Sequence, residues 1–228
     1  MKTNLFISPY EDSNAVRRLE LEKCMRLNFQ AGYDKIYLLI EQKDADYIQT
    51  FIAQNQFNNV IIEVVDQRPP FQKYIDKANT LGEEDINIVC NSDIYVLPED
   101  LQMIKDLPWQ KYPNLFVSLA RWDETAYGNF ILLDRQDTSD TFIWRGHSLV
   151  ERAYCPLGYP GVDHAVPFLF NEKGYKVVNP SRTIKTRHLH LSRVINYRLD
   201  SKPDGAVDAT KVCPPPYFFH PPIFVEQI

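Results

Sequence analysis

The stretch from Ile86 to Val96, INIVCNSDIYV, constrains the fold of this chain more than any other. Its first part is an apolar, β-branched run of strand length, which predicts a buried strand. Three polar residues then interrupt the run, and Asp93 lies where the strand ends. Open α/β sheets bind ligands at the carboxyl ends of their strands. The stretch therefore predicts a buried strand that delivers a carboxylate to a ligand site.

Strand and helix patterns alternate in the part of the chain that precedes this stretch. Apolar runs of strand length occur at residues 4–8, 35–40 and 60–65. Between them, apolar residues recur at helical spacing, first after Asp12 or Ser13, either of which would cap the helix, and again after Asp44. Gly32 is expected to end the first helix. A β-α-β-α-β order with short links predicts a parallel sheet with right-handed crossovers.

The second half of the chain continues this pattern less regularly. Pro98 fits the first turn of a helix at residues 97–107, and Gly174 is expected to end a helix at residues 165–170. The other predicted elements are a helix at residues 71–79 and strands at residues 115–119, 141–144, 176–178 and 183–190. The fold class expected from this order is α/β.

Residues 200–228 differ in composition from the rest of the chain. Three consecutive prolines, Pro214 to Pro216, exclude a regular helix there. Four aromatic residues, Tyr217, Phe218, Phe219 and Phe224, offer apolar anchors. We therefore expect one domain over residues 1–199, with residues 200–228 as a tail packed on that same domain.

Composition narrows the class of protein. A formal net charge of -5 argues against a nucleic-acid partner, since such binders are usually basic. No apolar run reaches about 18 residues, so we expect no membrane span, and the N-terminus turns polar too early for a signal peptide. The four cysteines are widely spaced and form no CxxC pair, which argues against a zinc ribbon. We predict a reduced, cytoplasmic protein in which Cys24 and Cys90 are buried thiols.

Three residues have the chemistry of a metal site. Asp93 offers a hard carboxylate, and His188 and His190 would face the same side of a strand because they are two positions apart. A divalent ion that holds a diphosphate needs such ligands and keeps positions open for phosphate oxygens. Plainer interpretations stand beside this one: Asp93 can be a turn residue, Asp163 a helix cap, and the histidine pair can serve many other purposes.

Three motifs, in this order along the chain, resemble those of nucleotide-diphospho-sugar glycosyltransferases of the GT-A fold, and most closely the family-2 type. NSDIYV resembles the DxD metal motif in a reduced form, with Asn91 in place of the first acid. GYPGVDHAVPFLFNEKGYKVVNPS resembles the acceptor-side motif, and IKTRHLHLS resembles the late segment whose histidine completes the metal site. The resemblance covers the chain from about residue 5 to residue 197.

The resemblance implies a three-layer α/β/α sandwich with a mainly parallel central sheet, and it implies roles for individual residues. Asp163 would be the catalytic base, and Asp93 with His188, His190 or both would hold Mn²⁺ or Mg²⁺. The other residues would contact the substrates. Trp122 would stack on a sugar ring, and His164 would lie beside the catalytic base, Asp163. The residues at the nucleotide and its phosphates would be Ser8, Pro9, Glu41, Arg68, Asn79 and Asn91.

The function expected from these residues is metal-dependent transfer of a sugar from a nucleotide-diphospho-sugar donor to a hydroxyl of a saccharide acceptor. One alternative is an inactive domain of this fold that binds a nucleotide, a glycan or a protein partner. Another is a nucleotidyltransferase, which would normally have a Gly-rich loop where this chain has SPYEDSN. A metal hydrolase built on the histidine pair is a further alternative. The donor sugar, the acceptor, the stereochemistry of transfer and the oligomeric state stay open.

Overall fold

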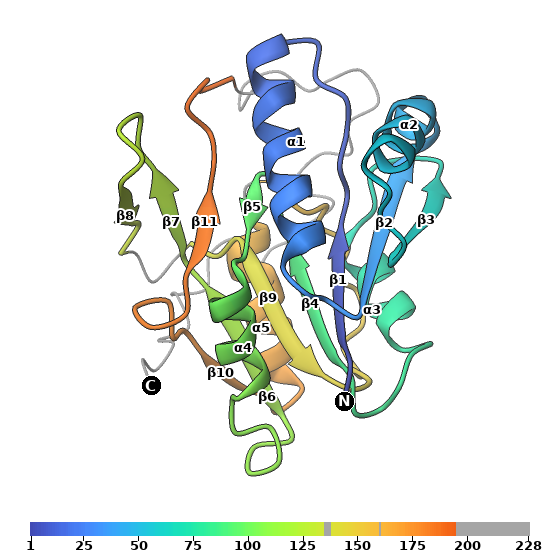
Figure 1. The fold of residues 1–228 in the computed structure, drawn as a ribbon. Coiled ribbons are helices and arrows are strands. Elements are labelled where there is room, and N and C mark those ends of the chain that lie inside the picture. The colour runs from blue at the N-terminus through green and yellow to red at the C-terminus, as the bar shows by residue number, and fades with distance from the viewer. Residues whose placement is uncertain (135–137, 160, 195–228) are drawn as a thin grey trace.

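The computed structural model describes residues 1–134, 138–159 and 161–194, and these contain two sheets (Figure 1). The larger sheet has seven strands in the order β10-β6-β9-β4-β1-β2-β3. Its neighbours are parallel, except that β9 runs antiparallel to both β4 and β6. Its strands are β1 (Thr3–Ile7), β2 (Lys35–Glu41), β3 (Val60–Val65), β4 (Ile86–Cys90), β6 (Leu115–Leu119), β9 (Thr141–Arg145) and β10 (Lys176–Val178).

Helices cover both faces of the large sheet. One buried cluster joins one face of its strands to α1, α2 and α4, and a second cluster joins the other face to α3 and α5. In Figure 1, α1 and α4 lie in front of the sheet and α5 lies behind it. The helices are α1 (Ala15–Gln30), the 3₁₀ turn η1 (Gln42–Asp44), α2 (Ala45–Asn55), α3 (Phe71–Ala78), α4 (Pro98–Lys105) and α5 (Val162–Glu172). The predicted three-layer sandwich with a mainly parallel central sheet is confirmed.

Alternation along the central strands explains why both faces are apolar. Leu5 and Ile7 of β1 enter the first cluster, while Phe6 between them enters the second. Successive side chains of a strand point to opposite faces, so a strand buried on both sides reads as a continuous apolar run. This is the pattern from which the strands of the large sheet were predicted. Trp144 of β9 is fully buried in the second cluster and therefore belongs to the core.

The smaller sheet was not predicted from the sequence. It has the order β5-β11-β7-β8 and consists of β5 (Ile94–Tyr95), β7 (Arg121–Glu124), β8 (Phe130–Leu132) and β11 (Thr186–His188). Only β11 lies where we expected a strand, and it is shorter than the expected 183–190. The other three have two to four residues each, which is too short for apolar periodicity to reveal them.

The start of α1 differs from expectation by a residue or two. Asn14, not Asp12 or Ser13, is the N-cap, and its side chain accepts hydrogen bonds from the backbone of Val16 and Arg17. Gly32 follows the helix at a φ of 98°, a conformation that glycine adopts without strain, and so ends the helix as predicted.

Asn28 fixes α1 to the strand that follows the Asn91–Ser92–Asp93 turn. It is fully buried; its amide donates to the Ile94 carbonyl at 2.7 Å, and its oxygen accepts from the Val96 backbone at 3.1 Å. Asn28→Ala would leave both backbone groups unpaired, and we expect it to lower the free energy of unfolding by about 2–4 kcal/mol. Urea denaturation measures this. Gln30→Ala, at an exposed position of the same helix, should stay within about 0.5 kcal/mol of wild type; equal losses in the two variants would contradict the assignment.

Several composition-based predictions can also be compared with the structure. Cys24 and Cys90 are free and fully buried, as predicted. Within the described ranges, no helix is both long and apolar enough to cross a bilayer. The predicted tail, residues 200–228, lies outside the described residues.

Candidate functional site

The Asn91–Ser92–Asp93 turn lies at the carboxyl edge of the large sheet. β4 ends at Cys90, and the Ile94 backbone donates to the Asn91 carbonyl at 3.1 Å to close the turn. Ser92 donates its hydroxyl to the carbonyl of Ser8, which follows β1, at 2.7 Å. The turn is thus tied to the end of the neighbouring parallel strand, at the edge where open α/β sheets bind ligands.

The smaller sheet carries His188 to Asp93. β11 pairs with β5 so that His188 is opposite Ile94, and the Leu189 backbone donates to the Asp93 carbonyl at 2.9 Å. His188 Nε2 consequently lies 3.2 Å from Asp93 Oδ2. Two residues 95 positions apart in the sequence meet because a short strand pair forms directly after the turn.

Asp93, His188 and His190 can form a metal site. One ligand atom from each lies within 4.8 Å of the others, and the two imidazole rings are 5.5 Å apart. His190 contacts the Val194 carbonyl through Nε2 at 2.9 Å, which leaves Nδ1 for another partner. A carboxylate and two imidazoles are suitable ligands for a first-row divalent cation, so the residues present fit the metal that the sequence predicted.

Arg17 of α1 also contacts this carboxylate, and its role was not anticipated. Its guanidinium lies 2.5 Å from Asp93 Oδ2, 3.2 Å from Glu20, and donates to the Leu189 carbonyl at 3.0 Å. Burial raises the pKa of the Asp93 carboxyl, but its contacts with His188 and Arg17 outweigh burial and hold that pKa well below its usual range. Asp93 is therefore an anion at neutral pH and available to a cation.

His188 lies between two carboxylates. Its Nδ1 is 2.7 Å from Asp123 of β7, opposite the Nε2 contact with Asp93. Burial disfavours the imidazolium, but the hydrogen bonds to Asp123 and Asp93 outweigh burial and raise the pKa of His188 to about 9. Burial lowers the pKa of His190, and the charge on Arg17 adds to this effect. Without a metal, His188 is the protonated member of the pair at neutral pH.

A second ion-pair group joins this cluster to Asn91. Arg121 contacts Asp123 at 2.9 Å and Asp140 at 3.1 Å, and Asp140 accepts from the Asn91 amide at 2.6 Å. The cluster contains four carboxylates, two guanidinium groups and the protonated His188, which gives a formal net charge of -1. The carboxylates are Glu20, Asp93, Asp123 and Asp140, and the guanidinium groups are Arg17 and Arg121. This excess of negative charge favours a bound cation.

Several predicted donor-binding residues gather beside the turn. The Ser8 hydroxyl donates to the Leu39 carbonyl at 2.6 Å, and Pro9 after it is buried. Arg68 stacks over the Tyr159 ring at 5.1 Å, and a Cβ on Gly158 would lie 2.7 Å from its guanidinium and 3.3 Å from Asn91 Oδ1. Asn91 Oδ1 is buried and has no hydrogen-bond partner within the described part of the chain, as expected for an acceptor that awaits a ligand or water.

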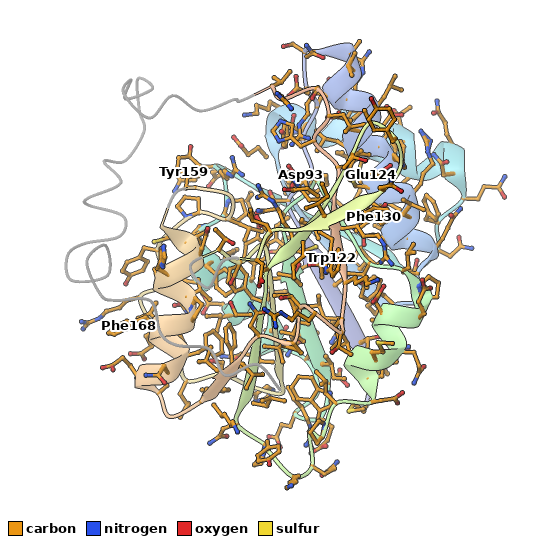
Figure 2. All side chains as sticks on the ribbon, turned by 90° about the vertical axis from the view of Figure 1, so that its left-hand side faces the viewer. Asp93, Trp122, Glu124, Phe130, Tyr159 and Phe168 are labelled. Carbon is orange, nitrogen blue, oxygen red and sulfur yellow. The ribbon has the colours of Figure 1, made fainter. Side chains whose placement is uncertain are left out.

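Asp163 and His164 lie in the first turn of α5. Gly161 holds the N-cap position at a φ of 95°, so Asp163 is not the cap that the plainer interpretation suggested. In the loop before this helix, Tyr159 stacks against Arg68, and Gly158 leaves no room for a Cβ beside Arg68 and Asn91. Figure 2 shows Tyr159 at the same upper level of the molecule as Asp93, with Phe168, further along α5, below it. The N-terminal end of α5 therefore faces the carboxyl edge of the sheet.

Two of the predicted site residues lie elsewhere. Asn79 was expected beside Asp93, but it exchanges two hydrogen bonds with Ser148, at 2.8 and 2.9 Å. It ends α3, which returns antiparallel to the strands, so it lies at their amino edge. Trp122 pairs with Arg187 in the register, one position before the Asp123–His188 pair, and so lies on the other face of the small sheet. Its indole donates to the Ser181 carbonyl and its ring is covered by Lys185.

Glu41 occupies an intermediate position. It ends β2 at the correct edge of the sheet, opposite Val65 of β3, and pairs with Lys43 at 3.1 Å. One strand, β1, thus lies between β2 and β4, which carries the turn.

Comparison with solved structures identifies the fold. The mannosyltransferase PcManGT from Pyrobaculum calidifontis, solved with GDP-Man and Mn²⁺, matches 82% of this chain with a TM-score of 0.55 and 10% identity. Residues 1–349 of TarS from S. aureus match 83% with a TM-score of 0.54 and 14% identity, and their complex with UDP-GlcNAc matches equally well at 15% identity. This chain has a GT-A-like fold. It spans 56–60% of the lengths of these structures.

The identities are low, so the likeness concerns the fold alone. No family model and no curated protein matches the chain.

The residues that sequence reasoning missed are Arg17, Arg121, Asp123 and Asp140. Asp140 directly precedes β9, and because β9 runs antiparallel to β4, its amino end lies at the carboxyl edge of β4. Strand direction was the missing information: a polar residue before an antiparallel strand marks the same edge as one after a parallel strand. In the sequence, Arg17 looks like a charged residue on the exposed face of a helix. It is buried because α1 packs against the small sheet.

Proposed function

We propose that this GT-A-like domain transfers a sugar from a nucleotide-diphospho-sugar donor to a hydroxyl of a saccharide acceptor, with a divalent metal as cofactor. The observation that carries the proposal is the convergence of Asp93, His188 and His190 at the carboxyl edge of the sheet, beside the free acceptor on Asn91. The donors of the similar structures, GDP-Man and UDP-GlcNAc, indicate the class of molecule to test.

The metal site would serve the leaving diphosphate. When bound, the ion would neutralise charge that grows on the nucleoside diphosphate. Asp93 and the two histidines would hold it, and two imidazoles favour Mn²⁺ over Mg²⁺, which prefers oxygen ligands. Arg68, held against Tyr159 at the same edge, would add a fixed positive charge for the phosphates.

The acceptor would enter from the side of α5. Asp163 in its first turn would take the proton of the acceptor hydroxyl as general base. A single acid at this position suits an inverting transfer. In a retaining transfer, the same carboxylate would orient the acceptor.

A domain of this fold that binds a nucleotide without turnover is the second candidate. Two observations favour it: Asn91 replaces an acid in the motif, and Arg17 already contacts Asp93 at 2.5 Å. Under this alternative the domain binds its ligand through the same edge but lacks transferase activity with any acceptor.

Thermal shift with nucleotide diphosphates and nucleotide sugars, each with and without Mn²⁺ or Mg²⁺, tests donor binding. A ligand at 100 times its Kd stabilises the native state by about 2.7 kcal/mol, which for a chain of this size raises Tm on the order of 5–10 °C. We expect such a shift for one nucleotide class and only when metal is present.

Two other results would change the conclusion. A shift without any product on incubation with saccharide acceptors would favour the binding domain. No shift with any nucleotide, with or without metal, would contradict both candidates.

A further inference from the structure

The orientation of His188 is set by residues outside the candidate metal ligands. Only one of its ring nitrogens, Nε2, faces Asp93, while Nδ1 lies 2.7 Å from Asp123 Oδ1. A neutral imidazole that donates from Nδ1 keeps its lone pair on Nε2. Asp123 therefore selects the nitrogen that points into the site.

Asp123 is in turn held by Arg121, two residues earlier on the same strand. The guanidinium contacts Asp123 through Nε at 2.9 Å and Asp140 through NH1 at 3.1 Å. Two anchored groups on one planar guanidinium leave it little freedom to turn. The position of Asp123 thus depends on a residue that does not touch His188.

The other arm of Arg121 reaches the opposite end of the Asn91–Ser92–Asp93 turn. Asp140 accepts from the Asn91 side chain at 2.6 Å, and its own carbonyl accepts from the Asn91 backbone at 3.2 Å. From Arg121, one path leads through Asp123 and His188 to Asp93, and the other leads through Asp140 to Asn91. Both ends of the turn are therefore tied to one guanidinium.

We propose that Asp123 and Arg121 are positioning residues. Asp123 directs His188 Nε2 toward the metal. Arg121 fixes the position of Asp123 and so links His188 to the Asp140–Asn91 pair. This inference rests on the proposed function, since it concerns the ligands of the same metal. Hydrogen-bond partners of metal-bound histidines fix the ring orientation and raise ligand basicity, and their loss typically costs about 10–100-fold in metal affinity.

Titration of the full chain with Mn²⁺ alone, followed by electron paramagnetic resonance of the free ion, tests the role of Asp123. We expect Asp123→Asn and Asp123→Ala to raise the Kd for Mn²⁺ by about 10–100-fold. Circular dichroism checks that each variant is folded. If one of the two variants does not fold, the other is sufficient for the test.

Glu124→Gln is the matched control. It removes the same charge from the next residue of β7, where the side chain contacts Tyr95 and Lys23 on the other face of the sheet. We expect its Kd for Mn²⁺ to equal that of wild type. A Kd raised equally in Glu124→Gln and Asp123→Asn would mean that general charge loss explains the effect, and would overturn the inference.

A double-mutant cycle tests the role of Arg121. If Arg121 acts through Asp123, Arg121→Gln weakens Mn²⁺ binding, and the double variant Arg121→Gln/Asp123→Asn binds no more weakly than Asp123→Asn alone. Additive losses would overturn the proposed link between the two residues.

The outcomes separate this inference from the proposed function. If wild type binds Mn²⁺ and Asp123→Asn binds it equally tightly, the inference is overturned and the transferase proposal stays in place. Mn²⁺ binding that depends on Asp123, in a protein that no nucleotide stabilises, would support the inference and count against the transferase. A wild-type protein that binds no Mn²⁺ would overturn both.

Discussion

Asp163→Asn is expected to lower the rate of sugar transfer by about 10²–10⁴-fold, the range that general-base catalysis contributes, while donor binding stays at the wild-type level. The amide keeps the shape of the side chain but cannot accept the proton of the acceptor hydroxyl. The donor should still bind, because its proposed contacts lie on the Asn91 turn, on Arg68 and on the metal ligands. Initial rates with the donor identified by thermal shift measure the loss, and the thermal shift itself measures binding.

Glu172→Gln is the control for this variant. It makes the same chemical change at the last residue of the same helix, where the side chain is exposed. Its rate should match that of wild type. Full activity of Asp163→Asn would remove Asp163 as the base, whereas loss of donor binding in that variant would mean that the residue serves the donor.

Most of the large sheet could be predicted from the sequence because six of its seven strands have five to seven residues and form mainly apolar runs. Six of its seven strands lie within one residue of the predicted bounds, and β4 (Ile86–Cys90) ends three residues before Asp93, where its end was expected. The antiparallel direction of β9 could not be read, since periodicity carries no information about strand direction. That one reversal places Asp140 at the site.

The candidate site could be predicted only where a motif named its residues. Asp93, His188 and His190 do converge, and the motif order along the chain anticipated this. The charged residues that contact these three were missed because the small sheet that brings them together has strands of only two to four residues. Asn79 was misplaced for a related reason: a helix that packs antiparallel to its neighbouring strands carries its last residue to the opposite edge.

Asp93→Asn is expected to have two effects, and the first is on metal binding. It removes the only carboxylate among the three proposed ligands. The loss in Mn²⁺ affinity should therefore exceed the 10–100-fold cost of losing an outer hydrogen-bond partner such as Asp123. Nucleotide stabilisation that required metal should disappear from the thermal shift. Asp106→Asn, at an exposed position after α4, is the control and should keep both; unchanged metal-dependent nucleotide binding in Asp93→Asn would contradict a metal role.

The second expected effect of Asp93→Asn is on stability, because Asp93 is also the counter-ion of a buried arginine. Arg17 is 4% exposed and would keep Glu20 as its remaining carboxylate partner. Breaking a buried ion pair from one side costs about 3–5 kcal/mol, and the remaining partner places this variant near 3 kcal/mol at neutral pH.

The stability difference between wild type and Asp93→Asn should also depend on pH. The pKa of Asp93 is lowered in the folded protein, so its stabilising contribution is complete above the unfolded pKa of about 3.9 and is lost as pH falls toward the folded value. The difference in the free energy of unfolding should therefore be largest near pH 5–6 and shrink below pH 4. It should also shrink as pH rises toward 9, because Asp93 helps to raise the pKa of His188 to about 9 and this contribution is lost as His188 deprotonates. Urea denaturation at several pH values measures it. A stability difference that persists undiminished in acid would show that it arises from lost packing and not from the charge of Asp93.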